Sequence, residues 1–479
     1  MNEAQPHPTF KVPAQVLAVL VIVAAIFMGG ATERMPQSVA LAAAGALPAA
    51  WFHSAAWRGA VQEAGIALPA TFSPQPRLTL EAWLLLAAGI SWMGWLMASP
   101  WDGTSRRLAA RIFVCGLAVL AVCVLVQWWT GWRPPGWLSA ESHGPFPNRN
   151  HTAHVLALGG VLAVGCAADA LRHGKVRMLP WLLAAGVILA ALATVYSRGG
   201  IVMLLCALGL WNVSVAWKRR SWKILLLWLS ALCVVASVLL VFGGPIAGRF
   251  AVDANFTGDF RLRIWSDARA LAADSPWCGA GLGNFSALFP FHRTASVIQS
   301  SVIHPESDWL WLVTEAGWPA AALALAAIVC ALAGAFPNER KTQRRLRTAA
   351  LAASVAAVVH AFVDVPGHRL GSALAAIFVM VLARRDAAPS AASRAALTMW
   401  RVSGLALIAL GAWWANVPDD EARAEVLSRD GKFSAAVVRA DRAIARAPLD
   451  WRPYFTRAVA LACDRNVIEA VGDCWSRTT

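Results

Sequence analysis

Four short polar stretches adjoin the long apolar runs of this chain, and the first of them could bind an anion. Asn148, Arg149 and Asn150 come directly before an apolar run. At a helix N-terminus these side chains would offer hydrogen-bond donors to an anion, together with the exposed backbone N–H groups and the helix dipole. The alternative is ordinary helix capping by Asn150 or Thr152, and spacing alone does not separate the two interpretations.

The second stretch, Tyr196-Ser197-Arg198-Gly199-Gly200, joins two apolar runs with almost no loop. Small neighbours would let a phosphate approach Arg198 closely, and the planar guanidinium could then grip it with two hydrogen bonds. The alternative is an arginine that snorkels to the interface and caps a tight turn. We favour phosphate binding, because a capping arginine would not need two glycines beside it.

The third stretch lies in a long loop, where Arg261 and Arg263 precede a short amphipathic helix expected over residues 264–273. Either arginine could reach an anion at the N-terminus of that helix. The sequence Asp274-Ser275-Pro276 ends the helix, and the glycine-rich run 279–283 that follows is expected to be flexible. No strand precedes these glycines, so they do not indicate a dinucleotide-binding fold.

The fourth stretch contains His304 and Glu306, just before another apolar run. A histidine and a carboxylate two residues apart could act as a general base and its orienting partner. The alternative is a polar belt at the membrane interface, anchored by the tryptophans that follow. Further along the chain, His360 and Asp364 share one helix face at i, i+4 spacing and emerge on the same side of the membrane.

Transmembrane helices must position these groups. The 479-residue chain is 58% hydrophobic and 14% charged, against roughly 25% charged residues in soluble proteins. Its continuous apolar runs exclude a single soluble core, a disordered chain and an outer-membrane barrel, whose strands alternate in polarity. We expect an all-α polytopic membrane protein with about twelve transmembrane helices of near 20 residues each. The expected spans are about 13–30, 37–53, 79–98, 109–129, 152–171, 179–196, 200–217, 223–242, 309–333, 347–364, 369–384 and 399–416.

The formal charge of +15 is explained by topology. Short connections rich in Arg and Lys alternate with connections that hold few, and the positive-inside rule places the basic ones in the cytoplasm. These basic connections lie near residues 106–111, 172–177, 218–223, 340–347 and 384–401. All four polar stretches then face the opposite, periplasmic side. We expect contact with membrane lipids and no nucleic-acid partner.

Two domains are expected. Residues 1–416 form the transmembrane domain, including a large periplasmic loop over residues 243–308 that should fold. Residues 417–479 are soluble in composition and resemble one tetratricopeptide-like unit with the start of another. A single unit buries its own face poorly, so the tail should pack on the membrane domain or bind a protein partner; the alternative is a merely amphipathic tail. No spacing suggests zinc or haem, and we expect no metal or cofactor.

In their order, spacing and common side, the polar stretches resemble the O-antigen ligase and polymerase superfamily of bacterial envelope glycosyltransferases. The resemblance covers roughly residues 146–370 and rests on Asn148-Arg149-Asn150, Ser197-Arg198-Gly199-Gly200, Arg261 to Trp265, Pro276 to Phe285, His304 to Glu315, and His360 to Asp364. It implies a multi-pass enzyme of the inner membrane. Such an enzyme takes a glycan from an undecaprenyl diphosphate carrier at the periplasmic face and transfers it to a hydroxyl of a glycan, a lipid core or a protein.

By position, the resemblance assigns the diphosphate to Arg198 and to Arg261 or Arg263, and the activation of the acceptor to His304. It gives Asn148, Arg149, Asn150, His360 and Asp364 supporting roles, and it implies that neither metal nor nucleotide is needed. This chain departs from the pattern at one place. Many relatives have a second histidine before the aromatic of the ninth span, whereas Glu306 stands here, and Glu306 must replace that histidine if it is the family's base.

A transporter or flippase of lipid-linked sugars is the alternative from another class, with the same arginines as a transient phosphate site. Transporters place their polar groups near the membrane midplane, often in broken helices or internal repeats. Here the polar groups gather at one face beside a large loop, and the sequence has no evident repeat. A scaffold that recruits partners through its tail is a third hypothesis, and it predicts that deletion of the tail alone mimics loss of the whole protein.

Overall fold

The computed structural model describes residues 11–27, 75–98, 101–134, 137, 144–219, 260–297, 302–335, 344–384, 420–446, 448 and 450–464. Within these ranges the regular structure is helical and no strand is formed, which confirms the expected all-α class. The spans expected near 37–53, 223–242 and 399–416 lie outside the described residues, and so do parts of the loop 243–308.

Within the described residues, five helices are long and apolar enough to cross a membrane. They are α5 (Gly103–Thr130), α6 (Arg149–Ala170, extended by the 3₁₀ turn η4, Leu171–His173), α7 (Leu179–Thr194, preceded by η5, Val176–Met178), α8 (Arg198–Arg219) and α13 (Asp308–Ala333). Three shorter apolar helices are α1 (Lys11–Phe27), α4 (Pro76–Ala98) and α15 (Leu370–Ala383). Their length and composition confirm a polytopic membrane protein.

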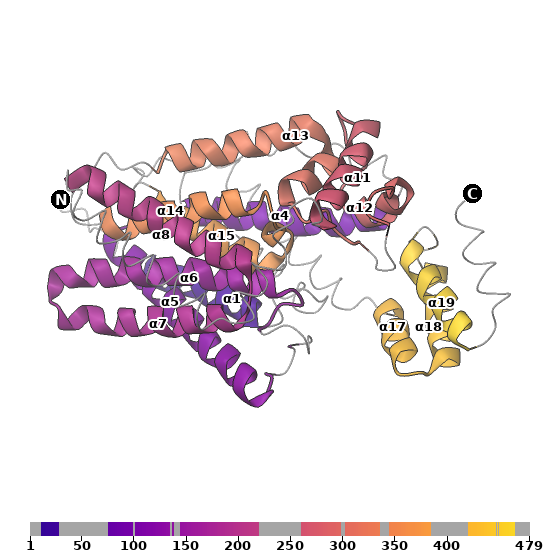
Figure 1. The fold of residues 1–479 in the computed structure, drawn as a ribbon, viewed down its shortest axis with the longest axis horizontal. Coiled ribbons are helices and arrows are strands. Elements are labelled where there is room, and N and C mark those ends of the chain that lie inside the picture. Colours follow the sequence, from indigo (N-terminus) through magenta and orange to yellow (C-terminus); the bar gives the residue numbers. More distant parts are fainter. Residues whose placement is uncertain are drawn as a thin grey trace, which may run out of the picture.

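Helix α6 lies at the centre of the bundle, where it packs against α5, α7, α8 and α14 (Arg344–His360) (Figure 1). Small residues permit this close packing, as they commonly do between membrane helices. A Cβ on Gly165 of α6 would lie 2.8 Å from the Cβ of Ala349 on α14, and one on Gly159 would lie 2.5 Å from a Leu117 side-chain atom on α5. Helices α8 and α14, which carry Arg198 and His360, therefore pack closely against α6.

The basic residues and the polar stretches lie at opposite ends of this bundle. Helix α5 begins beside Arg106 and Arg107, α6 ends before Arg172, and α14 begins at Arg344. The other end holds the first residues of α6, α8 and α13 and the last residues of α14, because consecutive helices run antiparallel through short connections. The four polar stretches thus meet at the end that lies away from the basic connections.

The described part of the long loop is folded. It contains α11 (Phe260–Asp274), α12 (Phe285–Leu288) and η7 (Phe289–His292), and Ile264, Phe285 and Phe289 form a small core with α13 residues around it. Helix α11 contains the helix expected over 264–273 and ends at Asp274, as expected. The backbone of α13 is interrupted at Gly317, whose φ of 82° lets Trp318 N donate to Pro276 O at 2.9 Å.

The described part of the tail contains three helices, α17 (Asp420–Arg429), α18 (Phe433–Arg446) and α19 (Trp451–Cys463), which pack on one another (Figure 1). Asp420 at the start of α17 accepts hydrogen bonds from Arg439 and Arg446 of α18. Arg452 of α19 lies 3.2 Å from Glu81 of α4, so the tail contacts the membrane domain. The repeat type of the tail stays a prediction.

Candidate active site

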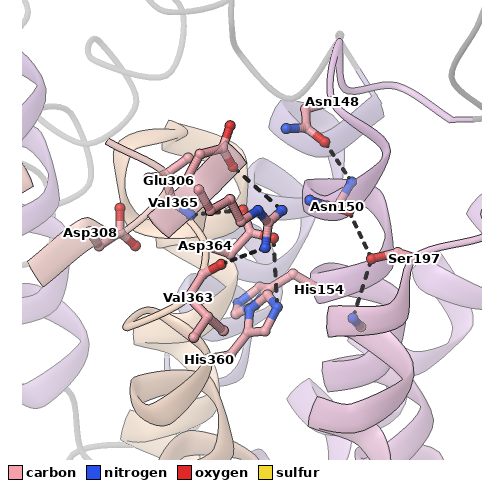
Figure 2. A network of polar contacts seen from close by, with 12 residues as sticks. Asn148, Asn150, His154, Ser197, Glu306, Asp308, His360, Val363, Asp364 and Val365 are labelled. Carbon is pink, nitrogen blue, oxygen red and sulfur yellow. Dashed lines mark hydrogen bonds and ion pairs between the residues drawn. The ribbon is translucent and has the colours of Figure 1, made fainter. Parts of the chain in front are cut away.

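The polar groups converge on the C-terminal end of α14. His360 and Asp364 form a contact of 3.7 Å between Nε2 and Oδ2, and the Nδ1 atoms of His360 and His154 lie 3.3 Å apart (Figure 2). Each imidazole nitrogen either donates or accepts, so a hydrogen on one of these two atoms links His360 of α14 to His154 of α6. All three side chains are buried, which makes this group part of the interior rather than a surface feature.

The glycines beside Arg198 are explained by helix packing. A Cβ on Gly199 would lie 2.7 Å from His360 Nε2, and one on Gly200 would lie 2.5 Å from the Cβ of Ala153. The first turn of α8 therefore approaches α6 and α14 only because these residues lack side chains. This corrects the argument that the glycines themselves indicate a phosphate. The close packing at these glycines instead brings Arg198, the first residue of α8, next to the His360–Asp364 pair.

The asparagines of the first stretch connect α6 to α8. Asn148 is the N-cap of α6 and accepts a hydrogen bond from Asn150 N at 2.9 Å, so the capping residue is Asn148 rather than Asn150 or Thr152. Asn150 Oδ1 in turn accepts from Ser197 Oγ at 2.9 Å, immediately before Arg198 (Figure 2). Arg149 is the first residue of α6 and is half-buried. These contacts fix the starts of α6 and α8 relative to each other.

Arg261 connects the loop helix α11 to the end of α14. Its guanidinium donates to Val363 O at 3.0 Å and lies 3.5 Å from the Glu306 carboxylate. Arg263, two residues further along the same helix, is exposed. The structure therefore brings Arg261, and not Arg263, to the His360–Asp364 corner.

His304 and Glu306 lie together, as their spacing suggests. His304 Nδ1 is 3.6 Å from Glu306 Oε1, and the φ of Glu306 is 55°, a strained value for a residue with a side chain. His304 is buried, and burial, together with the nearby side chains of Arg369, His368 and Arg261, lowers its pKa to about 4. His304 is therefore neutral at pH 7.

A histidine–carboxylate pair that the sequence did not predict, His368 with Asp308, lies next to His304. His368 Nδ1 lies 2.6 Å from Asp308 Oδ1, and the ring of His368 stacks on Trp311 with centroids 3.7 Å apart. The ring of His304 lies 5.8 Å from the same indole. His368 stands in the short connection after α14, so its position on the side expected to be periplasmic was a usable signal, but its partner is 60 residues away in sequence.

Glu315 holds the glycine-rich run that the sequence suggested would be flexible. Its carboxylate accepts hydrogen bonds from Gly283 N at 2.8 Å, Phe285 N at 3.0 Å and Trp311 Nε1 at 2.7 Å. Gly279 also packs tightly, because a Cβ there would lie 2.3 Å from the backbone carbon of Glu315. The expectation of flexibility is wrong, since this run is fixed on α13 and supports Trp311.

Within the residues that the structure describes, no three His, Cys, Asp or Glu side chains are arranged to hold a metal ion. The positive groups at the site include Arg198, Arg261 and Arg369, and its histidines include His151, His154, His304, His360 and His368. Such a set can bind an anion and exchange protons.

Comparison with known proteins identifies part of this chain. Residues 182–325 match the family model for O-antigen ligase, while the curated proteins give no match. The matched residues run from α7 into α13 and contain Arg198, Arg261, His304 and Glu306; the end of α14 lies beyond them. This family supports glycan transfer in polysaccharide or lipopolysaccharide biosynthesis by a multi-pass membrane protein. Residues 182–325 are therefore an O-antigen ligase domain, which confirms the resemblance of this chain to the O-antigen ligase superfamily.

Proposed function

We propose that this protein transfers a glycan from an undecaprenyl diphosphate carrier to an acceptor hydroxyl at the periplasmic face of the bacterial inner membrane. The O-antigen ligase domain supports the reaction class. The positive-inside rule supports the side of the membrane, because the polar site lies at the end of the bundle away from the basic connections. The acceptor is a glycan, a lipid core or a protein side chain.

The observation that carries this proposal is the position of two arginines at one corner of the fold. Arg261 donates to Val363, and Arg198 precedes Gly199, which packs against His360. Both arginines are half-buried, so their charge is weakly screened but can still meet a ligand. The departing diphosphate accumulates negative charge, and fixed guanidinium groups stabilise such charge as it develops. Glu306, 3.5 Å from Arg261, helps to orient that guanidinium.

In this reaction the acceptor oxygen attacks the anomeric carbon of the glycan. The bond between that carbon and the phosphate oxygen breaks, and its electron pair leaves with the diphosphate. The acceptor proton goes to a base, for which His304 and Glu306 are the candidates from the sequence pattern. Asn148, Arg149 and Asn150 support the starts of α6 and α8, and His360 with Asp364 supports the corner between the arginines. No metal is needed, because the arginines neutralise the leaving group.

Reconstitution of the full-length protein tests this function. The purified protein in lipid nanodiscs should form a covalent product from undecaprenyl diphosphate-linked glycan and a hydroxyl acceptor. Arg198→Ala and Arg261→Ala should each lower the rate by at least about 10²-fold, the loss seen when one preorganised donor is removed. Arg269→Ala, on the exposed face of α11, is the matched control and should retain the wild-type rate.

Two outcomes would contradict the proposal. Movement of lipid-linked glycan across proteoliposome membranes without any covalent product would favour a transporter. Loss of transfer in Arg263→Ala with normal transfer in Arg261→Ala would show that the diphosphate assignment is placed on the wrong arginine.

A further inference from the structure

We propose that His368, oriented by Asp308, is the base that removes the proton from the acceptor hydroxyl. This inference rests on the proposed function, and it replaces His304 and Glu306 in that one role. It arises from the contacts between the start of α13 and the connection between α14 and α15.

Asp308 is fixed at the start of α13 by three contacts. Its backbone N donates to the carbonyl oxygens of Ala361 and Asp364 at 2.9 and 3.0 Å, and its Oδ2 accepts from Gly367 N at 2.7 Å. A Cβ on Gly367 would lie 2.9 Å from that oxygen, so the glycine permits the approach. In Figure 2 Asp308 lies to the left of His360 and Asp364, apart from their contact. Its second oxygen, Oδ1, is the one that meets His368.

The partner of Asp308 determines which nitrogen of His368 can accept a proton. A carboxylate only accepts hydrogen bonds, so at 2.6 Å the Nδ1 atom of neutral His368 must carry the hydrogen. Nε2 then holds the lone pair. The flat stack on Trp311, with an angle of 2° between the rings, prevents the imidazole from turning. This is the arrangement by which an aspartate orients a catalytic histidine and balances the positive charge that it gains.

His368 is also accessible, in contrast to the other histidines of the site. Its side chain is 31% exposed, whereas that of His304 is 11% exposed. His154 and His360 are buried and contact each other. The imidazole of His368 is therefore more open to a hydroxyl from outside the protein than that of His304.

His304 is less suited to take the proton. Its pKa of about 4, caused first by burial, makes it a weak proton acceptor at neutral pH, since general bases work best with a pKa near the working pH. Glu306 is engaged with Arg261 and with His304. These two residues are better placed to hold Arg261 and the edge of Trp311 than to accept the proton.

His368 and the donor site share one short segment. Arg261 binds the carbonyl oxygen of Val363, and His368 follows five residues later in the same connection between α14 and α15. Every bond and proton in the proposed step is then accounted for. The acceptor O–H proton moves to His368 Nε2, the oxygen bonds to the anomeric carbon, and the electron pair of the broken bond leaves on the diphosphate held by the arginines.

The test uses the full-length protein in nanodiscs with undecaprenyl diphosphate-linked glycan and a hydroxyl acceptor. His368→Gln should lower kcat by about 10²- to 10⁴-fold, the usual contribution of a general base, with little change in KM for the donor. Asp308→Asn should cause a similar loss. Its amide oxygen can still accept from Gly367 N, but its NH₂ group donates to Nδ1 of His368 and so moves the hydrogen to Nε2.

Imidazole rescue distinguishes a chemical role from a structural one. Added imidazole should partly restore the rate of His368→Ala and should not restore that of His304→Ala. His292→Gln is the matched control, because His292 forms a pair of the same length, 2.6 Å, with Asp274 on the loop and lies outside the site. This variant should keep the wild-type rate.

The outcomes separate this inference from the proposed function. Absence of product from the wild-type protein would overturn the proposed function. A wild-type protein that transfers glycan, with a His368→Gln rate within about threefold of it, would overturn only the inference, because a general base contributes far more than that. Loss of activity in His368→Ala without imidazole rescue, together with a normal rate in Asp308→Asn, would also overturn it.

Discussion

Replacement of Glu315 by glutamine should release the glycine-rich run 279–283 from α13. The carboxylate accepts from Gly283 N, Phe285 N and Trp311 Nε1, and it is buried. In Glu315→Gln the remaining oxygen can still serve Phe285 and Trp311, but the NH₂ group would face Gly283 N, so that one hydrogen bond is lost.

The magnitude follows from these contacts. A hydrogen bond to a charged group contributes roughly 1.5–3 kcal/mol and a neutral one roughly 0.5–1.5 kcal/mol. Glu315→Gln removes one charged bond and makes two others neutral, which even at the lower ends of these ranges lowers the free energy that holds the run 279–283 by at least about 3 kcal/mol. At about 1.4 kcal/mol per tenfold, the local opening equilibrium should rise by at least on the order of 10²-fold.

Amide hydrogen exchange measures this opening directly, because exchange in native proteins reports local unfolding. The amides of Gly283 and Phe285 should exchange on the order of 10²-fold faster in Glu315→Gln than in the wild type. The control is Glu425→Gln, which removes an exposed ion pair with Arg429 in the tail and should change stability by less than about 1 kcal/mol. Unchanged protection at Gly283 and Phe285 would refute the assignment of Glu315 as the residue that fixes this run.

Three further predictions test the elements around the site. Burial favours a protonated Asp267, but hydrogen bonds led by that from Ser296 lower its pKa to about 2 from an ordinary 3.8. The ionised carboxylate should therefore add roughly 2 kcal/mol to the free energy of unfolding above pH 3.8, and this contribution should be lost as pH falls towards 2. Asp267→Asn should remove this pH dependence in acid unfolding. Glu81→Arg should break the tail contact with Arg452 and increase proteolysis of the tail, and unchanged protection of the tail would contradict this contact. Asn148→Ala removes the cap of α6 and should lower stability by about 1 kcal/mol in thermal unfolding, and an unchanged midpoint would contradict it.

Local patterns were predictable from the sequence. Apolar length predicted the helices, because a membrane leaves few alternatives to a span of about 20 residues. The pairs His304–Glu306 and His360–Asp364 also form, since residues two or four apart are kept close by the local backbone. The expectation that His360 and Asp364 share a helix face is wrong, because α14 ends at His360 and Asp364 lies in the turn that follows. The helix expected over 264–273 lies within α11 for the same reason.

Contacts between distant segments could not be predicted in this way. The pair of His368 with Asp308 joins residues 60 apart, and Glu315 reaches Gly283 over 32 residues. Sequence spacing carries no information about which helices become neighbours. The choice between Arg261 and Arg263 also required the structure, because it depends on how α11 is rotated against α14.

Binding of the carrier lipid tests the central claim, that Arg198 and Arg261 hold a diphosphate. The measurement is the equilibrium affinity of the purified protein in nanodiscs for undecaprenyl diphosphate and for undecaprenyl monophosphate. The wild type should bind the diphosphate more tightly, and Arg198→Ala and Arg261→Ala should each reduce that preference by about tenfold or more, since charge-assisted guanidinium–phosphate bonds contribute well over 1 kcal/mol. Equal affinity of the wild type for the two lipids, or an unchanged preference in both variants, would contradict the account.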